Sequence, residues 1–248
     1  MIGFNGGLIG KTRETMLASS VPGVWTAREQ LEAYRNQKWP GSSPVVLNGL
    51  VQYLDAGIAT SYPGTGTAWT DISTGGNDAT LVNGPVFSSA FGGIINFDGG
   101  DDRATSTLPA LSSFTFNAWV RLDTTSGERR AFTSFNDQLG IATTNTAVLI
   151  WNGNTNFSNL TIATNTWYNI AITSQSGATR LSINGSLDST FTTYRAITSG
   201  ATVIGAFQAP NYDRRWDGDI AVVSFYNRVL TTAEITQNYN AEKARFGY

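Results

Sequence analysis

Cysteine and histidine are both absent from this chain of 248 residues. Without cysteine the protein has no disulfide framework and no thiolate chemistry. Without histidine it has neither a Ser-His-Asp nor a Cys-His triad, and no zinc site with histidine ligands. Carboxylates, amides, hydroxyls, aromatic rings and the basic groups of lysine and arginine remain as groups from which a functional site can be built.

Charged residues are also scarce, at 14% of the chain, and the formal net charge at pH 7 is -2. A protein that binds nucleic acid usually carries a basic surplus, so we expect no nucleic-acid partner. No window approaches 18 consecutive apolar residues, which predicts no membrane insertion. Residues 1–7 have neither a basic start nor an apolar stretch, so we expect no signal peptide.

The apolar fraction of 41% is large enough for a chain of this length to bury a core. Residues 114–122 alternate between apolar and more polar side chains, which is the period-2 pattern of a β-strand. Residues 167–173 and 220–226 also read as strands, and Asn184-Gly185 favours a type I′ hairpin turn. Many short strands separated by turn signals predict an all-β sandwich.

Two capping boxes predict two short helices. Thr26 and Glu29 are spaced so that each side chain can bond the other's backbone N–H, and a helix should continue to about Gln37. Thr231 and Glu234 repeat this spacing and predict a C-terminal helix that runs into Tyr239.

The first 44 residues differ from the rest of the chain. They lack strand alternation and are poor in apolar residues, so we expect them to fold only against a partner. We therefore divide the chain into an N-terminal anchor, residues 1–44, and a β-sandwich, residues 46–248. The anchor's apolar side chains are the predicted docking residues: Trp25, Leu31, Tyr34 and Trp39.

Three successive segments, residues 70–79, 95–102 and 114–120, resemble the opening of a laminin-G-like domain of the concanavalin A-like lectin/glucanase superfamily. Later segments in the same order extend the resemblance over about residues 50–240: Trp167–Ala171, Leu181–Gly185, Trp216–Ile220 and Tyr226–Thr231. The resemblance implies an antiparallel jelly-roll sandwich. Together with the two capping boxes, we expect an all-β fold with one helix in a largely irregular N-terminal anchor and a short C-terminal helix.

The N-terminal segments Gly3–Gly7, Gly23–Thr26 and Lys38–Pro40 resemble the start of structural proteins of tailed phages. This second resemblance implies a protein of the virion surface, either a fibre or a decoration, made in the host cytoplasm. It also implies that capsid, collar or tail proteins are partners and that several copies are present.

Aromatic and amide side chains in Asn- and Gly-rich stretches are the candidate sugar contacts. Sugars stack on aromatic faces while amides bond their hydroxyls, which selects Trp151, Asn152, Asn154 and Tyr212. Arg214 and Arg215 beside Tyr212 offer contacts to an anionic polymer, or form a solvated loop. Trp216 fits better as a packed residue at the start of a strand.

Asp101, Asp102 and Asp137 are candidate calcium ligands, because calcium prefers carboxylate and carbonyl oxygens. The alternative is a solvated turn in which aspartates bond their own backbone. We expect that no cofactor is required and that calcium is optional.

A glycosidase needs two carboxylates that face one sugar. The chain has six glutamates, and no predicted strand carries two carboxylates at alternate positions. We therefore expect that the protein is not an enzyme.

The combined expectation is a phage surface protein that docks by its anchor and displays a lectin-like domain to host polysaccharide. The main alternative is a structural cement or decoration protein that binds no glycan. A secreted carbohydrate-binding module is disfavoured by the absent signal peptide, and a glucanase by the sparse glutamates.

Overall fold

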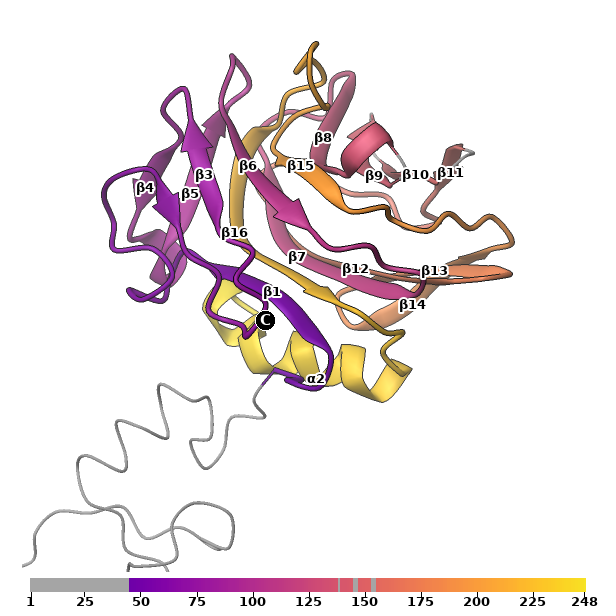
Figure 1. The fold of residues 1–248 in the computed structure, drawn as a ribbon. Helices are drawn as coiled ribbons and strands as arrows, with labels where there is room; N and C mark the ends of the chain where they lie inside the picture. The colour runs from indigo at the N-terminus through magenta and orange to yellow at the C-terminus, as the bar shows by residue number, and fades with distance from the viewer. Residues whose placement is uncertain (1–44, 138, 145–146, 153–154) are drawn as a thin grey trace, which may run out of the picture.

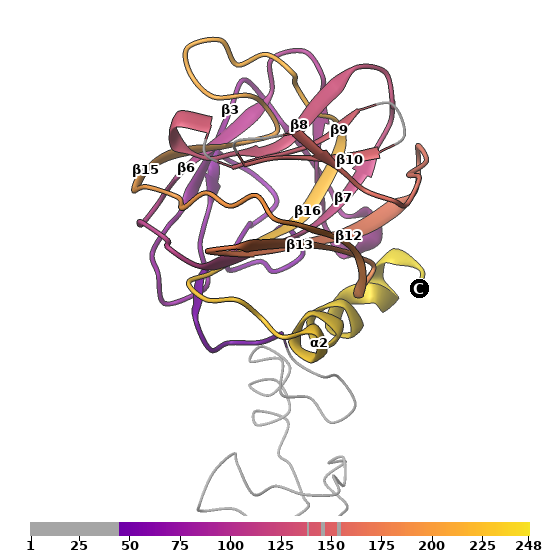
Figure 2. The same ribbon diagram turned by 90° about the vertical axis from the view of Figure 1, so that its right-hand side faces the viewer.

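The computed structural model describes residues 45–248 except 138, 145–146 and 153–154. Two antiparallel β-sheets pack face to face, and helix α2 (Thr232–Glu242) lies outside one of them (Figure 1). The view at right angles separates the two layers, with α2 beneath the lower one (Figure 2). The predicted sandwich with a C-terminal helix is confirmed, whereas the predicted helix after Thr26 lies outside the described residues.

Sheet I has eight strands within the described residues, of which β1 pairs with β16 beside the main path. In order across the sheet they are β14 (Ser186–Phe191), β13 (Ala178–Ile183), β12 (Trp167–Gln175), β7 (Phe114–Leu122), β16 (Asp217–Tyr226), β5 (Ile94–Asp98) and β4 (Val86–Ser88), with β1 (Leu50–Asp55) on β16.

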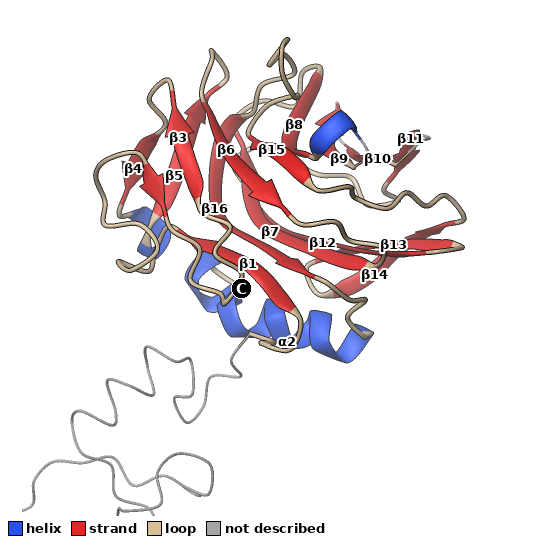
Figure 3. Cartoon of the chain, in the orientation of Figure 1, coloured by secondary structure: helices blue, strands red, loops and turns tan. Residues whose placement is uncertain are grey.

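Sheet II also has eight strands in the described part of the chain. Their order is β11 (Thr155–Phe157), β10 (Ala147–Trp151), β9 (Gly140–Thr144), β8 (Glu128–Thr133), β15 (Gly200–Ile204), β6 (Arg103–Leu108), β3 (Ala79–Val82) and β2 (Ala68–Trp69). Short 3-10 turns occur at η1 (Ala90–Gly92), η2 (Phe135–Asp137) and η3 (Lys243–Phe246), as Figure 3 shows among the strands.

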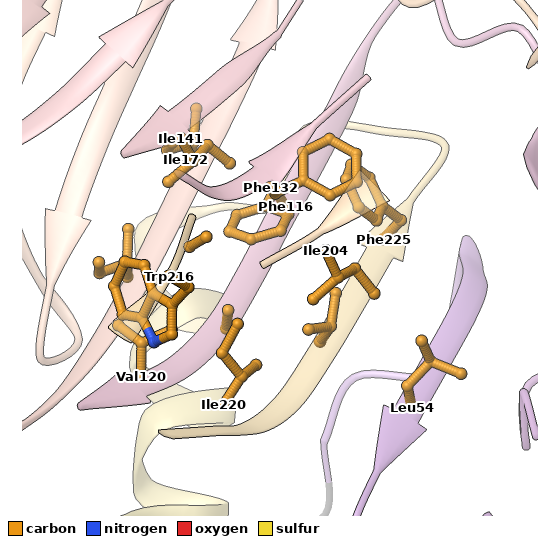
Figure 4. Close-up of a cluster of buried hydrophobic side chains, with 14 of the residues drawn as sticks. Leu54, Phe116, Val120, Phe132, Ile141, Ile172, Ile204, Trp216, Ile220 and Phe225 are labelled. Atoms are coloured by element: carbon orange, nitrogen blue, oxygen red, sulfur yellow. The ribbon is translucent and has the colours of Figure 1, made fainter. Parts of the chain in front are cut away.

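The main core fills the space between the two sheets. Phe116 on β7 packs its ring 5.4 Å from that of Phe132 on β8 and 5.1 Å from that of Phe225 on β16 (Figure 4). Trp216 lies in the same core and is fully buried, as its sequence context predicts. Phe132 and Arg130 lie two residues apart on β8. The packing of Phe132 in the core therefore also holds in place the strand that carries Arg130 on the outer face of sheet II.

The outer face of sheet I is covered by α2. The predicted capping box is present, with Thr231 and Glu234 bonding each other's backbone N–H groups. Buried Ile235 of the helix belongs to a second apolar cluster that also contains Trp119 and Val46. Both faces of sheet I are therefore buried over β7, where the sequence pattern predicted one apolar and one mixed face.

Asn184 and Gly185 join β13 to β14, and both have positive φ, at 51° and 75°. A type I′ turn requires this conformation at its two central residues, so the predicted hairpin is confirmed. Among the described residues, no helix has both the length and the apolar character needed to span a membrane.

Candidate functional site

The candidate site lies on the outer face of sheet II, at strands β8, β9 and β10. Ile141 and Ile150 are cross-strand partners that point into the core. Side chains alternate along a strand, so the next pair, Gly140 and Trp151, faces outward. This part of sheet II is on the opposite side of the sandwich from α2 (Figures 1 and 2).

Gly140 makes room for the guanidinium group of Arg130. A Cβ atom at this position would be 1.4 Å from Arg130 Nη1 and 3.3 Å from Asp137 Oδ1. Arg130 pairs with Ala142 on β9, and a bulge follows it in β8, so its side chain leans over the neighbouring glycine. Arg130 is only 4% exposed although it carries a full charge.

Two carboxylates and a second arginine surround this buried guanidinium. Arg130 Nε lies 2.7 Å from Glu128 Oε1, and Arg130 Nη1 lies 3.6 Å from Asp137 Oδ1. The other oxygen of Glu128 lies 3.2 Å from Arg214 Nε. We call Glu128, Arg130, Asp137 and Arg214 the rim cluster.

Phe207 provides an aromatic face for both arginines of the rim cluster. Its ring centroid is 5.5 Å from the guanidinium carbon of Arg130 and 4.7 Å from that of Arg214. The Phe207 N–H donates to the carbonyl of Asp213, which folds residues 205–216 back over the sheet. Stacking of this kind stabilises a guanidinium while its edge remains free to donate hydrogen bonds.

Asp137 links the rim cluster to the predicted sugar-contact residues. The Trp151 Nε1–H donates to the Asp137 carbonyl at 2.9 Å, and the Asp137 N–H donates to Gln208 Oε1 at 3.0 Å. The Gln208 carbonyl in turn accepts from the Tyr212 N–H at 3.2 Å. The structure therefore connects Trp151 and Tyr212 through one chain of hydrogen bonds, although they are 61 positions apart.

Burial raises the pKa of the Asp137 carboxyl. The positive charges of Arg130, Arg214 and Arg195 oppose this rise, and the negative charge of Glu128 adds to it. A carboxyl with a raised pKa beside an aromatic ring can either bond a sugar hydroxyl or donate a proton.

The predicted sugar-contact residues differ in how far their side chains are exposed to a ligand. Trp151 and Tyr212 are half-buried, and the Tyr212 ring is stacked under Arg103 at 4.1 Å. Asn152 is 2% exposed, and its amide nitrogen bonds Thr179 Oγ1 and the Thr193 carbonyl. The Asn152 side chain thus holds strands together and does not face a ligand, whereas Asn154 lies outside the described residues.

The predicted calcium ligands fall into two places. Asp101 and Asp102 share a turn with Asp98, and one carboxylate oxygen from each of the three lies within 4.8 Å of the others. Burial raises the pKa of Asp102, and the charges of Asp98 and Asp101 raise it further, against the hydrogen bond from the Asp98 N–H. Asp137 belongs instead to the rim cluster, where Arg130 balances its charge.

The predicted docking residues, Trp25, Leu31, Tyr34 and Trp39, lie outside the described residues. The first described residues, Val45 and Val46, pack against the outer face of sheet I, and the Val46 N–H donates to Asn238 Oδ1 of α2 at 2.8 Å. The chain therefore enters the sandwich on the layer opposite the rim cluster.

Several residues of the site were not predicted from the sequence, namely Gly140, Arg130, Phe207 and Gln208. The sequence did show a lone Glu128 beside two arginines, which is the nearest signal to the rim cluster. Nothing local marks Gly140 as the seat of a guanidinium, because the contact depends on a bulge in the neighbouring strand.

Taken together, two antiparallel sheets in a jelly-roll sandwich with a rim of aromatic and charged side chains define a lectin-like domain. The laminin G-like family model described as the concanavalin A-like lectin/glucanases superfamily matches residues 98–236. The chain belongs to this superfamily. No curated protein matches the sequence.

Solved structures share the fold at low sequence identity. A Trypanosoma rangeli sialidase in complex with sialic acid aligns with a TM-score of 0.65 at 16% identity, over 88% of this chain and 38% of that one. Domain 4 of AbnA, an arabinanase from Geobacillus stearothermophilus, was solved with arabinotriose. It aligns with a TM-score of 0.60 at 16% identity, over 78% of this chain and 100% of that one. The botulinum neurotoxin serotype G binding domain aligns with a TM-score of 0.60 at 17% identity, over 77% of this chain and 50% of that one.

These matches correct one expectation. The sequence predicted a protein that is not an enzyme, but the structures that share its fold include sialidase chains. The same fold occurs in toxin binding domains, so the fold serves enzymes and binding proteins alike. The chain spans about two-fifths of the sialidase chains that it matches.

Proposed function

We propose that this protein belongs to the surface of a tailed-phage virion and binds host glycans at the rim cluster and Trp151. The observation that carries the proposal is the position of Trp151. Its half-buried ring faces outward on β10 and is fixed by the Asp137 carbonyl, next to charged side chains that can bond sugar hydroxyls. An aromatic platform with a few convergent polar groups is the usual form of a sugar site.

The related folds support a carbohydrate ligand. The arabinanase domain was solved with arabinotriose, and the sialidase with sialic acid. The matches to toxin binding domains fit a domain that attaches a particle to a cell surface.

The place where the chain joins the sandwich, at Val45 and Val46, supports the proposal that residues 1–44 dock onto the virion. Val45 and Val46 join the sandwich on the outer face of sheet I, beside α2. The rim cluster is on sheet II, in the other layer. An anchor of residues 1–44 that docks through Trp25, Leu31, Tyr34 and Trp39 would leave the rim cluster facing away from the virion.

Replacing Trp151 with alanine is expected to weaken binding to purified host surface polysaccharide about tenfold or more, since aromatic anchors dominate binding energy. Surface plasmon resonance on the full chain, with calcium and then with EDTA, would measure the effect. Phe91→Ala is the matched control, because Phe91 is an exposed aromatic residue, at 43%, that packs on Trp167 near the other layer. Unchanged binding in W151A would contradict a site at Trp151, and absence of binding by the wild-type chain would favour the cement role.

Deleting residues 1–44 is expected to abolish incorporation into virions and to leave the sandwich folded. The physical reason is that the two apolar clusters that stabilise the sandwich are built from described residues, all of which follow position 44. Incorporation would be measured by blotting purified particles, and folding by circular dichroism. Full incorporation of the truncated protein would contradict an N-terminal anchor.

A further inference from the structure

From the charges around the rim cluster we infer that the glycan is acidic, a polysaccharide whose sugars carry carboxylates or sulfate esters. This inference rests on the proposed glycan-binding function and names the class of ligand. Five arginines form an arginine patch: Arg129, Arg130, Arg195, Arg214 and Arg215. Arg130 is buried, so the other four are the groups that can reach a ligand.

The distribution of charge along the chain sets this patch apart. The described residues contain eleven basic and fifteen acidic side chains, so their formal net charge is -4 (11 − 15). Five of the eleven basic side chains belong to the arginine patch, where they meet only Glu128, Asp137 and Asp213. Elsewhere in the described chain, six basic side chains are set against twelve acidic ones. A cationic patch on an otherwise anionic protein concentrates anionic ligands at that place.

Hydrogen bonds join four members of the patch, Arg129, Arg130, Arg214 and Arg215. The Arg130 N–H donates to the Arg214 carbonyl at 2.6 Å, which brings β8 against residues 205–216. Arg129 Nη1 donates to the Arg215 carbonyl at 3.2 Å. The charge of Arg195 acts on Asp137 from the loop between β14 and β15.

Two members of the patch have charges that no carboxylate balances in the described part of the chain. Arg129 Nε donates to the Ser126 carbonyl at 3.1 Å, and Arg215 Nε donates to the Tyr212 carbonyl at 2.8 Å. Carbonyl partners fix a guanidinium in place without cancelling its charge. The remaining N–H groups can form the paired hydrogen bonds that carboxylates and sulfates accept from arginine.

The position of Trp151 favours an anionic sugar over another polyanion. Its indole nitrogen is bonded to the carbonyl of Asp137, whose carboxylate is in contact with Arg130. A sugar ring on the indole would therefore lie beside Asp137, whose N–H donates to Gln208 of the segment that carries Arg214 and Arg215. A polyanion without sugar rings would gain nothing from Trp151.

The test measures binding of the full chain to polygalacturonate, dextran sulfate, neutral dextran and poly-glutamate. We expect binding to at least one of the two acidic polysaccharides, with an affinity that falls about tenfold or more between low salt and roughly 0.5 M salt, because exposed charges are screened. The double variant Arg129→Gln/Arg215→Gln should bind about tenfold less tightly. Arg180→Gln on β13, an exposed arginine in sheet I, is the matched control and should bind like the wild type.

The four probes and the variants distinguish the class of ligand that the protein binds. Tighter binding to polygalacturonate would indicate that the glycan ligand carries carboxylates. Tighter binding to dextran sulfate would indicate that it carries sulfate esters. Binding to neutral dextran that is insensitive to salt and to the double variant would overturn the inference and leave the proposed glycan-binding function standing. Equal binding to poly-glutamate, unaffected by Trp151→Ala, would overturn it in favour of a general polyanion surface. Binding to host polysaccharide but to none of the probes would also overturn it.

Discussion

Replacing Glu242 with glutamine is expected to raise the free energy of unfolding at pH 8 by about 3 kcal/mol and to leave it almost unchanged at pH 4. Glu242 is the last residue of α2 and is only 8% exposed. Its pKa is raised from 4.5 to about 7, chiefly by burial and further by the charge of Asp55. Hydrogen bonds from Tyr53 and Trp119 and the charge of Arg245 oppose the rise.

The sign of this stability change follows from the number of protons that Glu242 binds in the folded and in the unfolded protein. Between pH 4.5 and about 7 the folded protein holds a proton on Glu242 that the unfolded chain has already lost. The wild type is therefore most stable below pH 4.5 with respect to this group, and it loses that stability as the pH rises through about 7. Glutamine is uncharged throughout and has no such loss.

The glutamine side chain can keep both hydrogen bonds. Trp119 Nε1–H donates to one carboxylate oxygen of Glu242 at 2.6 Å, and the Tyr53 hydroxyl donates to the other at 3.0 Å. In the variant, the amide oxygen would accept from Trp119 while the amide nitrogen donates to the Tyr53 oxygen. The hydroxyl proton of Tyr53 could then turn toward Asp55 Oδ2, which is 3.5 Å away.

Glu234→Gln on the same helix is the matched control, and its effect should have the opposite sign. The pKa of Glu234 is lowered to about 2, first by its hydrogen bonds with Arg228 and then by the capping box with Thr231. The ionised group stabilises the fold above pH 4.5, and this contribution is lost as the pH falls through about 2. The variant should lose about 1 kcal/mol at pH 7, since Glu234 is a quarter exposed.

Chemical denaturation at pH 4, 6 and 8 would measure both variants. Equal destabilisation by E242Q at every pH would contradict a proton on Glu242 and would indicate that its charge is needed to hold the C-terminal helix.

Replacing Phe116 with alanine is expected to lower the free energy of unfolding by about 3–5 kcal/mol. Phe116 is 1% exposed, and its ring contacts that of Phe132 of sheet II and that of Phe225 of sheet I, which lie 4.8 Å from each other. The substitution removes a ring that bridges the two layers and leaves a cavity that a packed sandwich cannot collapse to fill. Urea denaturation at constant pH would measure the loss.

The control for this substitution is Phe157→Ala on β11, where the ring is 49% exposed and the expected loss is below about 1 kcal/mol. A loss of similar size in both variants would contradict the assignment of Phe116 to the center of the core. Because Phe132 shares β8 with Arg130, F116A should also weaken glycan binding under conditions that leave the domain marginally folded.

The local elements of this fold could be read from the sequence because each depends on neighbouring residues. The alternation over residues 114–122 matches β7, whose period of two follows from strand geometry. Asn184 and Gly185 form the predicted turn, since they tolerate positive φ. Thr231 and Glu234 form the predicted capping box, because its two hydrogen bonds join residues three positions apart.

The site could be predicted only in part, because it depends on which strands become neighbours. Trp151 and Asp137 were chosen by residue type, as sugar contact and as calcium ligand, but their pairing through one hydrogen bond follows from the folded loop. The bulge in β8 places Arg130 on Gly140, and no local pattern encodes that contact.

The sequence by itself determined the class of the fold, its hairpin turn and its C-terminal helix, because short-range hydrogen bonds and the alternation of apolar residues specify them. The tertiary structure alone decided that Asn152 is buried, that Arg130 and Arg214 share Glu128 and that the carboxyl of Glu242 is buried against Trp119. Those features depend on the register and packing of strands far apart in the chain, and burial, not residue type, sets the energy of their charges.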